Sequence, residues 1–106
     1  HGIDLYPHVA LPEVFLLVHP VGTVLGRATY GNFLVVHQGV TVGAAGGEYP
    51  VLGEGTTLFA DARVLGAAKC GQDVVFGANA MIIGGVIPDD SLVVGQYPHH
   101  RVLRRA

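Results

Sequence analysis

The side chains best suited to proton chemistry in this chain are its histidines. The chain has six histidines, eight acidic residues and a single cysteine among 106 residues. An imidazole can accept a proton from a hydroxyl group near neutral pH, and a neighbouring carboxylate can orient the ring. Taken singly, Asp4 is better explained as a turn residue and His19 as a histidine in the wall of the fold. Their role therefore depends on the elements that position them.

The composition predicts one small domain, residues 1–106, that buries part of its surface against other copies. Half of the residues are hydrophobic, 13% are charged, and the mean hydropathy is +0.47. A domain of this size exposes a large share of its surface, and large apolar patches are rarely left in water. No run approaches the roughly 20 apolar residues of a membrane span, and no signal peptide is recognised.

Charge and cysteine content narrow the possible partners and the possible cellular compartment of the protein. The net charge is −2, and basic residues gather only near the end of the chain, at Arg101, Arg104 and Arg105. We therefore expect no nucleic-acid partner. The single Cys70 excludes an intramolecular disulfide framework and fits a cytoplasmic protein.

The second half of the chain repeats every six residues. Residues six apart form one apolar column and one column of small or β-branched residues, which neither a 3.6-residue helix nor a simple alternating strand produces. The pattern predicts an all-β fold, a left-handed parallel β-helix of hexapeptide repeats, with about 18 residues in each three-sided coil and the first column pointing inward. The first column is apolar: Leu52, Leu58, Val64, Cys70, Phe76 and Ile82. The fifth column is small or β-branched: Thr56, Ala62, Ala68, Val74, Ala80 and Val86.

The first half follows the same pattern with a change of register. Leucines at positions 5, 11 and 17 keep the six-residue spacing, and the later register resumes at Leu34, which predicts a slip of one residue between Gly22 and Phe33. Residues 43–50 (GAAGGEYP) predict a loop that leaves one corner. We expect about five coils, closed by the chain after Ile87 and ending in a short helix or a tail. A small β-sandwich is the alternative fold.

Several motifs resemble the hexapeptide-repeat acyltransferases, and among these the serine acetyltransferases. HGIDL at residues 1–5 resembles the H-G-I-D-I that opens the β-helix of that family. LVHPVGTVLG at residues 17–26 resembles its L-D-H-A-T-G-I-V-I-G, and QGVTVG at residues 38–43 resembles its Q-[NG]-V-T-L-G. The matching spacing of Asp4 and His19 is more specific than any single hexad. The helical N-terminal domain of that family has no counterpart here, so the chain can be a fragment of a longer protein.

The resemblance implies transfer of an acetyl group from acetyl-CoA to a small hydroxyl-bearing acceptor. His19 would be the general base, and Asp4 the carboxylate that orients it. Acetyl-CoA would be a co-substrate, with no permanently bound cofactor. Two protomers would form each site of a homotrimer.

The resemblance also implies where CoA would bind. Backbone N–H groups near Gly43 and Ala44 would stabilise the oxyanion. The pantetheine arm would contact the backbone at Ala60 and Ala78, where small side chains permit a close approach.

Three positions depart from the family's pattern around the acceptor. Val18 replaces the Asp of the D-H dipeptide, which removes a contact to the amino group of serine. Glu48 and Tyr49 replace the Arg and His that precede the proline of the loop, and Glu48 reverses the local preference from anions to cations. We therefore expect an acceptor other than serine, such as a sugar, alcohol or amine, bound by Glu48, Tyr49 and His37.

Two other functions fit the sequence. A noncatalytic trimeric β-helix scaffold with a decayed site would explain the altered loop and the loss at position 18. A metal hydratase like the γ-carbonic anhydrases uses the same solenoid but needs three histidines around the metal ion. Only His19 and His37, one 18-residue coil apart, are candidate ligands, so we expect no metal site.

Overall fold

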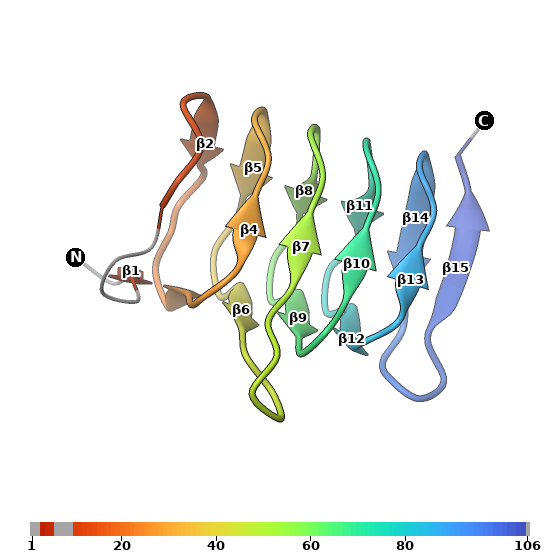
Figure 1. Ribbon diagram of the computed structural model, residues 1–106. Coiled ribbons are helices and arrows are strands. Elements are labelled where there is room, and N and C mark those ends of the chain that lie inside the picture. Colours follow the sequence, from red (N-terminus) through yellow and green to blue (C-terminus); the bar gives the residue numbers. More distant parts are fainter. Residues whose placement is uncertain (1–2, 6–9, 106) are drawn as a thin grey trace.

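The computed structural model describes residues 3–5 and 10–105, and these fold into a three-sided solenoid of short strands (Figure 1). The chain runs up one face, returns along another and advances by one coil at each turn, in the left-handed sense. Within the described ranges every regular element is a strand. The predicted all-β parallel β-helix is confirmed.

Each side of the prism is one hydrogen-bonded sheet. Sheet A runs β1-β3-β6-β9-β12, sheet B runs β15-β14-β11-β8-β5-β2, and sheet C runs β13-β10-β7-β4. Sheet A contains Ile3–Leu5, Thr23–Leu25, Thr41–Gly43, Arg63–Leu65 and Met81–Ile83. Sheet B contains Phe15–Leu17, Leu34–Val36, Thr57–Leu58, Val75–Phe76, Ser91–Val94 and Arg101–Arg104. Sheet C contains Thr29–Tyr30, Val51–Leu52, Lys69–Cys70 and Val86–Ile87.

The interior is formed by the two columns that the hexad pattern predicts. All six residues of the first column are buried, and five of the six in the fifth column are buried with them. Phe76 is the largest fully buried side chain and pairs in register with Leu58 and Val93. Cys70 is only 6% exposed, and burial raises the pKa of its thiol to about 12. As predicted, Cys70 is a hydrophobic core residue.

Two corners are one residue shorter than the count of six. Successive inward residues are five apart between Leu25 and Tyr30, and again between Ile82 and Ile87. The second shortening puts Ile87 inside and leaves Val86 77% exposed, so the prediction that Val86 continues the fifth column is wrong.

The ends of the solenoid agree with the sequence-based expectation except in the last residues. Four complete coils and one incomplete coil are present in the described residues, close to the expected number of about five. The chain after Ile87 closes the solenoid as predicted, but it ends as β15 and not as a helix or a tail. Strand β15 runs antiparallel to β14, with Leu103 opposite Leu92. It covers the edge that β14 would otherwise present for pairing with another chain.

The three edges of the prism have their own geometry. The B–A edge joins sheet B to sheet A, the A–C edge joins A to C, and the C–B edge joins C to B. At the C–B edge the coils approach so closely that a Cβ atom on Gly31 would lie 2.7 Å from backbone atoms of Gly53 and Glu54. Glycine is therefore required there by space, because any Cβ atom would overlap the backbone of the next coil.

Candidate active site

His19 lies on the B–A edge in a corner that contains two additional residues. Leu17 pairs with Val36 and Val24 pairs with Thr41, so the first coil uses six residues where the next uses four. The extra residues make a double turn, in which Val21 N–H donates to the His19 carbonyl at 2.8 Å and Thr23 N–H donates to the Pro20 carbonyl at 3.1 Å. The insertion lies earlier in the chain than the predicted slip of one residue. That slip is the net result of the two residues gained at this corner and the one residue lost after Leu25.

The backbone of His19 is strained in a way that presents its ring to solvent. Its φ is 46°, in the left-handed region, and its side chain is exposed. Residues without a glycine's freedom adopt this conformation at a cost of about 1–3 kcal/mol, and they concentrate at functional sites. The additional residues therefore place the predicted general base outside the regular wall of the prism.

Asp4 belongs to β1, which pairs with β3, the strand that follows the His19 corner. The backbone of Asp4 is in register with Val24. The side chain of Asp4 lies outside the described part of the structure, so the dyad with His19 stays a prediction.

His37 does not stack on His19, because the two additional residues shift the register. The pairing of Leu17 with Val36 places His37 opposite Val18 rather than His19. The His37 ring instead stacks on Phe59 of the next coil, with centroids 4.8 Å apart and planes at 24°. His19 and His37 therefore do not lie together in successive coils, and acceptor binding by His37 stays a prediction.

Ala60 and Ala78 continue the same edge above His37. Asn79 N–H donates to the Ala60 carbonyl at 2.9 Å, which stacks the two corners directly. Both side chains are small and neither is fully buried. The edge thus offers an accessible backbone leading away from His19, which is the geometry expected for an extended arm such as pantetheine.

The remaining predicted residues lie on the A–C edge, where a hairpin leaves the solenoid after β6 (Figure 1). Ala45 and Glu48 exchange backbone hydrogen bonds of 2.9 and 3.2 Å around Gly46 and Gly47, which have φ of 62° and 79°. Such paired positive φ values define a two-residue type I′ turn. The predicted loop is confirmed.

An unexpected cation lies beside the hairpin. Arg27, in the A–C corner of the preceding coil, places its guanidinium carbon 4.6 Å from the centroid of the Tyr49 ring. Thr29 N–H donates to the carbonyl of the buried Pro50 at 2.9 Å and fixes the base of the loop against the same coil. Sequence reasoning missed Arg27, because the contact depends on the path of the hairpin across the coils.

The predicted site residues therefore form two groups within one chain. His19, Ala60 and Ala78 lie on the B–A edge, whereas Gly43, the last residue of β6, and the hairpin lie at the other end of the sheet A strands. The strands of sheet A separate the two groups.

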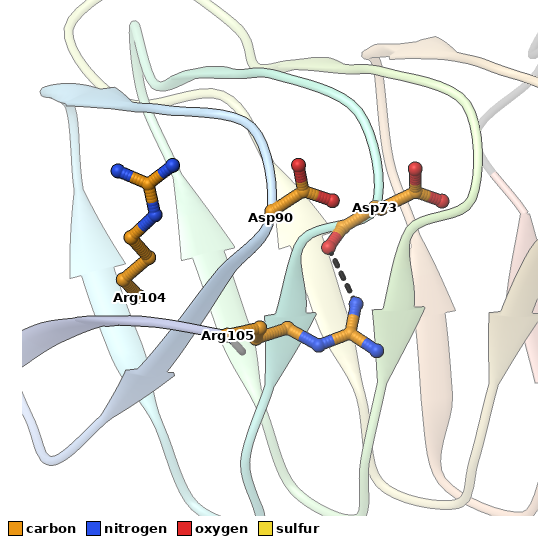
Figure 2. A pocket seen from close by; sticks show the side chains of 4 residues that line it. All are labelled: Asp73, Asp90, Arg104 and Arg105. Carbon is orange, nitrogen blue, oxygen red and sulfur yellow. Dashed lines mark hydrogen bonds between the residues drawn. The ribbon is translucent and has the colours of Figure 1, made fainter.

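A separate cavity of about 640 Å³ opens beside the last coils (Figure 2). It is lined by Asp73, Asp90, Arg104 and Arg105. Arg105 donates from its Nη1 to the Asp73 carbonyl at 2.7 Å and from its backbone N–H to the Asp90 carbonyl, also at 2.7 Å. These bonds attach the closing strand to the C–B edge. None of the predicted site residues lines this cavity.

Residues 3–5 and 10–105 contain no group of three or more His, Cys, Asp or Glu side chains that could hold a metal ion. Nor does that part of the structure contain a helix of the length and hydropathy needed to cross a membrane.

Comparison with known proteins relates the chain to one group of enzymes. No family model matches the chain. Serine acetyltransferase of Staphylococcus aureus strain Mu50 is 35% identical over 95% of the chain and 49% of its own length. The crystal structure of Neisseria gonorrhoeae serine acetyltransferase superposes with a TM-score of 0.85 and 29% identity, over 98% of this chain and 41% of that one.

A second crystal structure of the Neisseria gonorrhoeae protein, in complex with serine, matches with a TM-score of 0.80 and 32% identity, over 89% of this chain and 40% of that one. The chain spans about half the length of the curated relatives it matches, or somewhat less. The sequence and the fold agree, and the chain is a homologue of the serine acetyltransferases with their hexapeptide-repeat β-helix.

Proposed function

We propose that this chain transfers an acetyl group from acetyl-CoA to the hydroxyl group of serine. The observation that carries the proposal is its 35% identity to a serine acetyltransferase over 95% of its length. The exposed, strained position of His19 supports it, because a general base must reach its substrate.

In the proposed reaction His19 takes the proton from the serine hydroxyl as its oxygen attacks the thioester carbonyl. The new C–O bond forms an oxyanion intermediate, which collapses as the C–S bond breaks. His19 then returns the proton to the departing CoA sulfur, giving O-acetylserine and CoA. Asp4 would hold the imidazole in the correct tautomer and stabilise its protonated form.

The division of the site residues between two edges favours an active site shared between copies. The B–A edge of one protomer would supply His19 and the backbone at Ala60 and Ala78 for the pantetheine arm. The A–C edge of its neighbour would supply Gly43 and Ala44 as oxyanion donors. A closed trimer would repeat this pairing three times.

The comparisons favour serine as acceptor over the alternatives expected from Glu48. That expectation rested on the cost of placing a carboxylate beside an unmatched buried charge. Glu48 is exposed, so water screens its charge, and Arg27 lies beside the same loop. The physical objection to serine is therefore much weaker than the sequence suggested.

The experiment is a coupled assay for free CoA thiol with acetyl-CoA and serine, comparing the native chain with His19→Ala. We expect the variant to lose at least about 100-fold in kcat, as for removal of a general base, with an unchanged unfolding midpoint. His99→Ala, which removes another exposed histidine, is the matched control and should retain activity.

Native levels of turnover in His19→Ala would refute the proposed base. Absence of turnover in the native chain, together with absence of acetyl-CoA binding by calorimetry, would instead support the noncatalytic scaffold.

A further inference from the structure

The contact between Arg27 and Tyr49 suggests how the acceptor loop compensates for its missing cation. Serine carries a carboxylate, and a site that removes this group from water needs a positive partner. The hairpin itself contributes only Glu48, an anion. Arg27 approaches the hairpin from the preceding coil and lies over the Tyr49 ring.

The geometry of this contact leaves Arg27 able to bind. A guanidinium that stacks on an aromatic ring uses its flat face, whereas its five N–H donors lie in its plane. Those donors match the two oxygens of a carboxylate and can bind them as a parallel pair. The ring also restricts the rotamers of a long side chain that is otherwise exposed.

We propose that Arg27 determines acceptor specificity by binding the carboxylate of serine, and that Tyr49 positions Arg27 for this contact. The inference rests on the proposed function. Arg27 and Tyr49 share the A–C edge with Gly43 and Ala44, so all four would enter the site from the same protomer. The carboxylate would be bound there, with the serine hydroxyl directed to His19 of the neighbouring copy.

The test compares serine with serinamide, which keeps the hydroxyl and the amino group but lacks the carboxylate charge. In Arg27→Ala we expect KM for serine to rise about 10- to 100-fold, the usual effect of losing a charged hydrogen bond. KM for serinamide should change less than about threefold, and kcat at saturating serine should stay within a few fold. Arg27→Lys should recover part of the loss, because it keeps the charge without the planar fork.

Three further variants test whether the effect of Arg27 is a specific contact and whether Tyr49 positions it. Lys69→Ala removes an exposed cation from the coil that follows the hairpin, where Lys69 pairs with Val51. This variant should leave KM for serine unchanged. Tyr49→Ala should raise KM for serine but not for serinamide, and Tyr49→Phe, which keeps an aromatic ring beside Arg27, should recover most of that loss.

The outcomes distinguish this inference from the proposed function. Turnover of serine by the native chain with an unchanged KM in Arg27→Ala would overturn the role of Arg27 and leave the acetyltransferase intact. Equal increases of KM for serine and serinamide would also overturn it, since the carboxylate would not be the group bound. If the native chain acetylates neither compound, both proposals fall.

Discussion

Replacing Phe76 by alanine should cost more stability than any other single truncation in the interior. Its ring is fully buried between Leu58 of the preceding coil and Val93 of the following one. Transfer of the ring to water costs about 2 kcal/mol. If the stiff coils leave a cavity of about 100 Å³, the void adds about 2.4 kcal/mol. We therefore expect the free energy of unfolding to fall by about 4 kcal/mol.

The assay is equilibrium unfolding in guanidinium chloride, followed by far-ultraviolet circular dichroism at fixed protein concentration. Phe59→Ala is the matched control, because that ring is 40% exposed at the adjacent B–A corner and loses only its stack on His37. It should cost about 1 kcal/mol or less. Equal losses for the two variants, or a loss below about 1.5 kcal/mol for Phe76→Ala, would refute the assignment of Phe76 to a packed interior column.

Three further predictions concern the corners and the thiol. Gly31→Ala should lower the free energy of unfolding by about 2 kcal/mol or more, because the added Cβ meets backbone atoms at 2.7 Å; Gly77→Ala, whose Cβ would have 3.4 Å of space, should cost less in the same denaturation assay. Phe33→Gly should raise the melting temperature, since Phe33 is 62% exposed and has a φ of 60°, which costs about 1–2 kcal/mol for a residue with a Cβ; a drop would mean that its ring makes a stabilising contact. Burial raises the pKa of the Cys70 thiol from 9.0 to about 12. The contribution of this thiol to the free energy of unfolding should therefore be complete below pH 9 and be lost as the pH rises towards 12. Cys70→Val should flatten that part of a profile of stability against pH.

The β-helix could be predicted from sequence because one physical constraint repeats in every coil. Each inward position must be apolar, and its neighbour near the corner must be small, so errors at single residues average out. Val86 shows the limit of this reasoning. A corner one residue shorter changes which side chain points inward, and Val86 is as acceptable as Ile87 by residue type alone.

The site was less predictable because it depends on departures from the repeat. The two additional residues at the His19 corner and the shortening after Leu25 nearly cancel, so counting hexads shows only a slip of one. From that net count alone, neither the strained backbone of His19 nor the offset between His37 and His19 could be predicted. Arg27 gave no sequence signal, because its partner Tyr49 lies more than one coil further along the chain.

The proposed chemistry requires that the reacting sulfur of CoA lie beside His19 at a junction between two copies of the chain. A crystal structure of the chain with CoA and serine tests this directly. We predict the CoA sulfur and the serine hydroxyl within hydrogen-bonding reach of the His19 ring, with the hairpin of a neighbouring protomer closing the site. CoA bound away from the B–A edge, or His19 with no contact to either substrate, would contradict the account.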